Sequence, residues 1–347
     1  MNAFEQMNWS IWQTLNDQEK LILMRQVLMY FVSPLTLVKD VKLQNFSMQG
    51  ISCRTFEFTI NGEPFVFVPG IPETILGFDQ SSTQININEW LASDAAFQFM
   101  EHHEKINPPT THELATFINE HTSQLRKATI LPMLVSKYAV PVGAQFIGDL
   151  DTVSGNFTGD TKVYATFEND LLPQIYPSQT SKEALDWEFP KTIFEPGRYY
   201  GFLDAADNHY HLYTHELLNL GQLKKKLRRF NFYLPTEDEF EYMMTAGSRR
   251  LFPYVHHETF FDGQKVLPPY QLKENMFGLQ MNLGQSTWQL LEKVSLLKNG
   301  PVDLNAPNLL EAIMPLSPYA RTIMPTEQSD TYSTTDFQFY KVIRIKP

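Results

Sequence analysis

Three histidines lie close together in the chain and are candidates for a metal-binding site. They are His209, His211 and His215, and the last two are four positions apart. If this segment continues the helix that the apolar periodicity of residues 212–227 predicts, His211 and His215 share one helix face. Neutral imidazoles at this spacing suit zinc or iron. The pattern therefore indicates a metal centre at His211 and His215. The alternative interpretation is that these histidines lie at the surface or are hydrogen-bonded within the protein.

Other groups of reactive side chains have less favourable spacing. Residues 102–104 and 256–258 each read His-His-Glu, and adjacent residues point in different directions on a helix or a strand. The acidic residues in 237–241 fall in the first turn of a predicted helix, and the basic run 224–229 falls at the end of another. The helix dipole favours negative charge at the first position and positive charge at the second. Cys53 is the one cysteine, so an internal disulfide and a cysteine-based zinc site are both excluded.

Composition narrows the class of protein. The 347 residues are 43% hydrophobic and carry 28 basic against 39 acidic side chains, for a net charge of −11. This is typical of a folded protein, and the negative charge argues against a nucleic-acid partner. No apolar run is long enough to span a membrane, and the N-terminus lacks the pattern of a secretory signal. We therefore expect a soluble cytoplasmic protein that binds neither nucleic acid nor a membrane.

The clearest local signal is a β-hairpin. Residues 55–60 and 63–68 alternate between apolar and polar types, and Asn61-Gly62 stands between them. Asn-Gly supplies the positive φ angles of a type I′ turn, whose twist matches two paired strands. In the resulting register Phe58 faces Phe65.

Further elements are predicted from capping boxes and periodicity. A capping box is an Asn or Thr followed three residues later by Glu, and it marks the first turn of a helix. The remaining predicted elements are helices over 9–31 (capped by Asn16), 88–103, from Thr110, over 212–227 and from Thr236, strands over 129–142 and 337–345, and a loop-rich stretch over 143–199. We interpret residues 80–127 as a helical insertion.

Several of these segments, in this order, resemble the formylglycine-generating-enzyme (sulfatase-modifying-factor) superfamily. The matching segments are Phe65-Val66-Phe67-Val68-Pro69-Gly70, residues 130–140, Phe232-Tyr233-Leu234-Pro235-Thr236-Glu237-Asp238-Glu239-Phe240-Glu241-Tyr242, residues 275–285 and the closing residues 339–344. The resemblance implies an α+β fold, a variant of the C-type lectin fold. It also implies the following division: an N-terminal helical region over 1–48 and the superfamily domain over 49–347.

The resemblance also shows what this chain lacks. Oxidase members of the superfamily bind copper through two late cysteines, because thiolates favour Cu(I). Here Cys53 lies in the first hairpin, so we do not expect formylglycine formation. Met281 replaces an aspartate that holds a structural calcium in many relatives, and Asn275 and Asn282 are the oxygen donors left for a residual calcium site.

The resemblance further implies a cleft lined by late loops. The candidate ligand-binding residues of that cleft are Arg321, Tyr319, Trp288, Tyr254 and His256. Arginine and aromatic side chains suit a protein interface or an anionic ligand, and packing in a loop-rich core is the alternative. We therefore expect a non-oxidase binding or accessory protein whose partner is a protein or a small molecule. The alternative is a metal-dependent oxidoreductase with a His-ligated metal.

Overall fold

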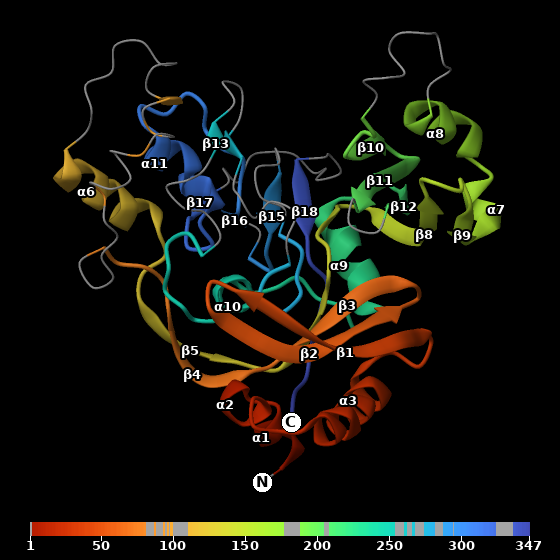
Figure 1. The fold of residues 1–347 in the computed structure, drawn as a ribbon, viewed down its shortest axis with the longest axis horizontal. Coiled ribbons are helices and arrows are strands. Elements are labelled where there is room, and N and C mark those ends of the chain that lie inside the picture. Colours follow the sequence, from red (N-terminus) through yellow and green to blue (C-terminus); the bar gives the residue numbers. More distant parts are fainter. Residues whose placement is uncertain are drawn as a thin grey trace.

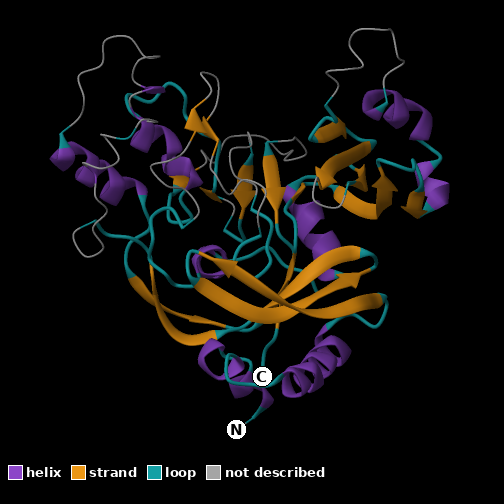
Figure 2. Cartoon of the chain, in the orientation of Figure 1, coloured by secondary structure: helices purple, strands orange, loops and turns teal. Residues whose placement is uncertain are grey.

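The computed structural model has an α+β fold, as expected. It describes residues 2–80, 110–176, 188–204, 208–253, 260–261, 266–267, 274–281, 287–293, 295–323 and 336–347, together with Ile87, Ser93, Ala96, Gln98 and Phe99. Sheets and short helices are arranged around one large hydrophobic core and one small core (Figures 1 and 2). No helix in these ranges is both long enough and apolar enough to span a membrane.

The large core is built on an antiparallel sheet of strand order β1-β2-β3-β6-β19. Its strands are β1 (Val38–Met48), β2 (Ile51–Ile60), β3 (Glu63–Val68), β6 (Met133–Ser136) and β19 (Val342–Arg344). The last strand of the chain therefore pairs with β6, at the opposite side of the sheet from β1. We call this sheet, together with the elements packed on the large core, the body.

The hairpin predicted around Asn61-Gly62 is confirmed. Asn61 and Gly62 have φ angles of 53° and 85°, and β2 pairs with β3 antiparallel with Phe58 opposite Phe65. The rings of Phe58 and Phe65 are stacked with their centroids 6.2 Å apart. A local turn signal was sufficient here because a two-residue loop fixes the register.

The N-terminal region differs from the expected single helix. It forms α1 (Ala3–Gln6), α2 (Trp9–Trp12) and α3 (Asp17–Phe31), which lie below the sheet in Figure 1. The predicted capping box of α3 is present, with the Asn16 side chain accepting from the Glu19 N–H and the reverse bond also made. The helical region does not extend to residue 48, because β1 begins at Val38 and pairs with β2. The exposed polar residues in the first half of β1 conceal its strand periodicity.

A second sheet of the body has strand order β17-β16-β15-β18-β7. Its strands are β17 (Thr322–Ile323), β16 (Leu296–Lys298), β15 (Trp288–Leu290), β18 (Phe337–Phe339) and β7 (Val140–Pro141). The single strand expected over 337–345 is therefore divided, because β18 belongs to this sheet and β19 to the first sheet.

Smaller elements complete the body. The paired strands are β4 (Ile71–Leu76) with β5 (Arg126–Ile130) and β13 (Phe260–Phe261) with β14 (Val266–Leu267), and the helices are α6 (Thr111–His121), α10 (Glu237–Thr245), α11 (Leu309–Ile313) and a 3₁₀ turn (Met314–Leu316). The capping boxes predicted at Thr110 and Thr236 are both present. Within the helix expected over 88–103, the structure describes only Ser93, Ala96, Gln98 and Phe99, and the last three are helical.

A separate folded unit is inserted between β7 and the helix α9 (Leu220–Arg228). Its sheet has strand order β10-β11-β12-β8-β9, and it packs around the small core (upper right in Figure 1). The elements are β8 (Ala144–Asp151), β9 (Phe157–Gly159), α7 (Thr161–Tyr164), α8 (Glu168–Ile175), β10 (Thr192–Glu195), β11 (Tyr199–Asp204) and β12 (His209–His215). We call this unit the module.

The module corrects two predictions from the sequence. The stretch 143–199 is not loop-rich, and the helix expected over 212–227 begins only at Leu220. Part of the reason is a close approach of two strands at Gly148 and Gly159, which are opposite each other. A Cβ atom at Gly148 would lie 2.2 Å from the Thr158 carbonyl oxygen, so glycine is required inside this pair rather than in a loop.

Candidate functional site

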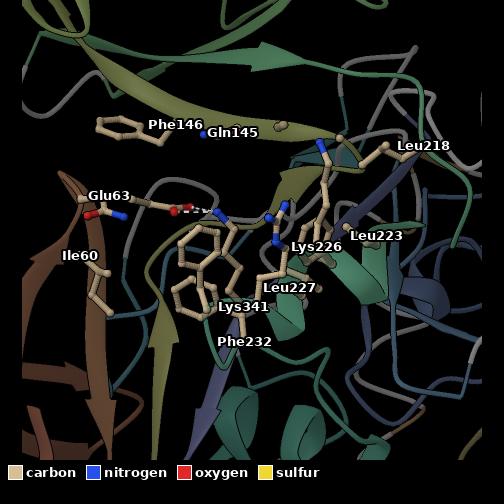
Figure 3. A pocket seen from close by; sticks show the side chains of 16 residues that line it. Ile60, Glu63, Gln145, Phe146, Leu218, Leu223, Lys226, Leu227, Phe232 and Lys341 are labelled. Carbon is tan, nitrogen blue, oxygen red and sulfur yellow. Dashed lines mark hydrogen bonds and ion pairs between the residues drawn. The ribbon is translucent and has the colours of Figure 1, made fainter. Parts of the chain in front are cut away.

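A pocket lies where the body, the module and α9 meet. Its volume is about 370 Å³, and the residues around it come from the β2–β3 hairpin, the start of β8, α9 and the segments 230–232 and 339–341 (Figure 3). We call it the junction pocket. Since its walls come from chain segments far apart in the sequence, no local motif could have predicted it.

The walls of the junction pocket are mainly apolar. The apolar side chains around it are Ile60, Phe146, Leu218, Leu223, Leu227, Phe230, Phe232 and Phe339. Phe232 stacks on Phe65 of β3 with ring centroids 5.5 Å apart, which fixes that wall to the main sheet. At Gly62 a Cβ atom would lie 3.0 Å from the Phe146 ring, so the turn glycine also makes room for Phe146.

One buried ion pair faces the pocket. The Lys341 Nζ donates to both carboxylate oxygens of Glu63, at 2.6 and 2.9 Å, and both residues are buried (Figure 3). The Lys341 backbone N–H donates to Ser136 Oγ, which holds this segment against β6. The two charges of this pair therefore compensate each other.

The C-terminal end of α9 supplies two more cations, Lys226 and Arg229. Lys226 is paired with Glu216, on the segment that leaves β12. The side chain of Arg229 has no hydrogen bond or ion pair to any residue in the described ranges. Arg229 is exposed, and it brings to the rim of the pocket a positive charge that no described residue pairs with.

A second cluster of polar groups lies at the contact between module and body. His211 on β12 is buried, with its Nδ1 2.6 Å from Asp149 Oδ1 and its Nε2 3.8 Å from Asp204 Oδ2. Tyr138 of the body donates its hydroxyl to the same Asp204 oxygen at 2.6 Å. Burial lowers the pKa of His211, but the hydrogen bonds to and negative charges of Asp149 and Asp204 outweigh it and raise that pKa to about 9. We call these four residues the histidine cluster.

The proposed metal pair needs correction, because His211 and His215 are on a strand and not on a helix. The Nδ1 atom of His215 accepts a hydrogen bond from the Gly197 N–H at 2.9 Å, and burial lowers the pKa of this histidine. The Nδ1 atom of His211 is held by Asp149. Among the described residues there is no group of three or more metal-ligating side chains.

The candidate cleft residues that the structure describes, Arg321, Tyr319 and Trp288, do not line the junction pocket. Arg321 forms a two-pronged ion pair with Glu237, at 2.7 and 2.5 Å, and this pair lowers the pKa of Glu237 against the effect of burial, to about 2. Tyr319 is fully buried, and Trp288 packs against Gly300. Tyr254 and His256 lie outside the described residues.

Of the two oxygen donors expected for a residual calcium site, the structure describes Asn275. The Asn275 side chain donates to the Met243 carbonyl oxygen and accepts from the N–H groups of Phe277 and Leu279. Its oxygen therefore serves to fix the turn before Met281, and a calcium ligand role would compete with those bonds. Asn282 lies outside the described ranges.

A further charged cluster surrounds α10. Glu241 accepts from Lys298 Nζ at 2.8 Å, from Arg126 at 3.0 Å and from the Gly77 N–H at 3.1 Å. Lys298 also contacts Glu237 at 2.9 Å. Because Glu241 and Lys298 are fully buried and mutually satisfied, we assign this glutamate cluster to the stability of the body.

The sequence did not identify Asp149, Asp204, Tyr138 or the Glu63–Lys341 pair. A usable signal was present in β12, where Tyr210 and Leu212 alternate with His211 and Tyr213. The first two face the small core, and Tyr213 belongs to the large core. This period of two indicates a strand that divides two cores.

Part of the chain matches a known protein family. Residues 145–214 match a family described as a profilin-like domain of unknown function (DUF7278). No curated protein matches the chain. The matched range runs from β8 to β12, so it coincides with the module and leaves the body and α9 outside. The module is therefore similar to a profilin-like domain.

Proposed function

We propose that this protein is a non-oxidase binding protein that takes up a small, largely apolar molecule in the junction pocket. The observation that carries the proposal is the pocket of about 370 Å³ with mainly apolar walls and few polar groups. Ligand sites in proteins usually have this character and a volume of about 300–1,000 Å³. They also occur preferentially between structural units, as this pocket does.

Kinship of the body to the sulfatase-modifying-factor superfamily, with its C-type-lectin-like fold, is part of the proposal. Three of the segments that resemble the superfamily lie in β3, β6 and β19, which are neighbours in one sheet. A fourth contains α10, whose Glu239 is paired with Arg344 of β19. These segments thus form one unit, which supports common descent.

The buried state of Cys53 supports a function other than the oxidase chemistry of that superfamily. Burial raises the pKa of the Cys53 thiol to about 12, so it stays protonated near neutral pH. A His-ligated oxidoreductase has less support than a binding protein, because in the described part of the chain no group of three or more His, Cys, Asp or Glu side chains could hold a metal ion. Metal analysis of purified protein tests this alternative. If the protein contains stoichiometric iron, copper or zinc, and a His211→Ala/His215→Ala variant loses it, the oxidoreductase is better supported than the binding protein.

The experiment that tests the binding proposal is a fluorescence titration with N-phenyl-1-naphthylamine, a neutral aromatic probe. We expect saturable binding of one probe per chain, and loss of that binding in Ala144→Phe, which fills the pocket from β8. The matched control is Ala165→Phe, an exposed position of the module away from the pocket. Equal binding by both variants would contradict the proposal.

A further inference from the structure

We propose that the ligand of the junction pocket carries an anionic group and that Arg229 binds this group. This inference rests on the proposed function, and it adds the chemical class of the ligand: an organic acid with a flat apolar body.

The charges around the pocket leave one cation free. Lys341 is compensated by Glu63, and Lys226 is compensated by Glu216. Arg229 lines the same pocket, and nothing in the described ranges pairs with its side chain. In a chain with a net charge of −11, a positively charged pocket is a local exception. A bound anion would supply the missing charge.

The guanidinium group is suited to this role. Its planar N–H groups match the two oxygens of a carboxylate, phosphate or sulfonate. Arg229 is exposed, so its guanidinium is in contact with water at the rim of the pocket. A ligand whose apolar body lies in the pocket would bring its anionic group to this rim, where a charge-assisted hydrogen bond replaces that water.

The opposite explanation is that Arg229 only complements the dipole of α9. Three other cations, Lys225, Lys226 and Arg228, already lie in the last turn of that helix. Arg228 and Arg229 are both exposed and both lie at the C-terminal end of α9, but only Arg229 lines the pocket. Arg228 is therefore a matched control for every measurement on Arg229.

Aromatic side chains indicate the shape of the ligand body. Phe146, Phe230, Phe232 and Phe339 are all in the walls. Aromatic rings pack best against other flat rings, in stacked or edge-on geometry. An aromatic acid fits both the walls and Arg229.

The test compares two probes that differ by a single group. 8-Anilinonaphthalene-1-sulfonate is N-phenyl-1-naphthylamine with an added sulfonate, and both are titrated into the full chain by fluorescence. We expect the sulfonate probe to bind more tightly than the neutral probe. Arg229→Gln should weaken the sulfonate probe about tenfold or more, as for loss of a charged hydrogen bond, and should leave the neutral probe unchanged. Arg228→Gln should change neither affinity.

A competition series identifies the anionic group. 1-Naphthoate and 1-naphthyl phosphate should each displace the sulfonate probe, and the tighter competitor distinguishes a carboxylate ligand from a phosphate ligand. 1-Naphthylmethanol should displace it poorly.

Three outcomes would overturn the inference. If the neutral probe binds and the sulfonate adds nothing, the pocket binds ligands but not anions. If Arg229→Gln and Arg228→Gln weaken the sulfonate probe equally, the effect comes from surface charge. If neither probe binds, the proposed function fails and the inference fails with it.

Discussion

The glutamate cluster of the body and the histidine cluster at the module differ in how completely their charged side chains are buried. Glu241 and Lys298 have 0% exposed side chains, and each is held by several partners. His211 is buried too, but the Asp149 side chain paired with it is 36% exposed. The charge of His211 is lost just above the neutral range, because its pKa is raised to about 9.

This difference indicates two uses of buried charge. In the body, the charges lie between α10, β5 and β16, so they hold together elements of one core. At the module, Tyr138 comes from the body while Asp204 and His211 come from the module. The histidine cluster therefore joins two units, and its strength varies with pH. The junction pocket lies beside the same contact, because Phe146 lines the pocket and its ring centroid is 6.3 Å from that of His211.

The largest effect should come from removing the central carboxylate of the body. Glu241→Ala removes the fully buried partner of Lys298, which keeps Glu237 and the Tyr319 carbonyl oxygen, and removes an acceptor from Arg126 and Gly77. Breaking a buried ion pair on one side costs about 3–5 kcal/mol. Urea unfolding monitored by tryptophan fluorescence would measure the loss in the free energy of unfolding.

The matched control is Glu73→Gln, which breaks the exposed Glu73–Lys127 pair. Exposed pairs contribute about 0–1 kcal/mol. If Glu241→Ala costs no more than this control, the glutamate cluster does not stabilise the body as described.

The next effect is the pH dependence of the histidine cluster. The pKa of His211 is raised on folding, from the ordinary value of 6.5 to about 9, so its contribution is complete below pH 6.5 and is lost as the pH rises through 9. Over that window we expect a loss on the order of 1–3 kcal/mol, since hydrogen bonds to charged groups have that strength. Urea unfolding at pH 7, 8, 9 and 10 would measure it.

The variant His211→Asn should be less stable than wild type at pH 7 and should lose less stability between pH 7 and 10. If wild type and His211→Asn have parallel pH profiles, the charge of His211 does not stabilise the contact between module and body.

A smaller, localised effect is expected from Tyr138→Phe. It deletes the hydroxyl that donates to Asp204 at 2.6 Å and keeps the ring, which lies 4.9 Å from the His211 ring. The free energy of unfolding should fall by about 1–3 kcal/mol or less. The Asp204 acceptor is charged, but its side chain is partly exposed to water, which weakens the effect of losing the hydrogen bond. Hydrogen exchange should accelerate in β11 and β12 and remain unchanged in β2 and β3. Uniform acceleration would show that module and body unfold as one unit.

Elements marked by local sequence signals could be predicted, whereas elements defined by contacts between distant residues could not. Signals read over a few residues were reliable: the Asn61-Gly62 turn and the capping boxes at Asn16, Thr110 and Thr236 are all present. The strand β12 was mistaken for a helix because four-residue spacing places His211 and His215 on one side of either element.

The junction pocket and both charged clusters could not be predicted in this way. Glu63 and Lys341 are 278 positions apart, and Glu241 and Gly77 are 164 positions apart. Such pairs form only when the sheets assemble, so no spacing rule along the chain reveals them. The glycines of β8 and β9 concealed the module, because a close strand pair needs the same residue type as a loop.

The smallest expected effect uses two exposed ion pairs that match across the two regions. Asp17–Arg54 in the body and Asp170–Arg198 in the module each join the first turn of a helix to a neighbouring segment, with similar exposure of both partners. The hydrogen bond to Arg54 lowers the pKa of Asp17, but solvent screens charges at such a surface. Asp17→Asn and Asp170→Asn should therefore leave the urea midpoint indistinguishable from that of wild type. If Asp170→Asn alone lowers the midpoint, the module depends on its surface charges, and the contrast between the regions would no longer rest on the buried clusters.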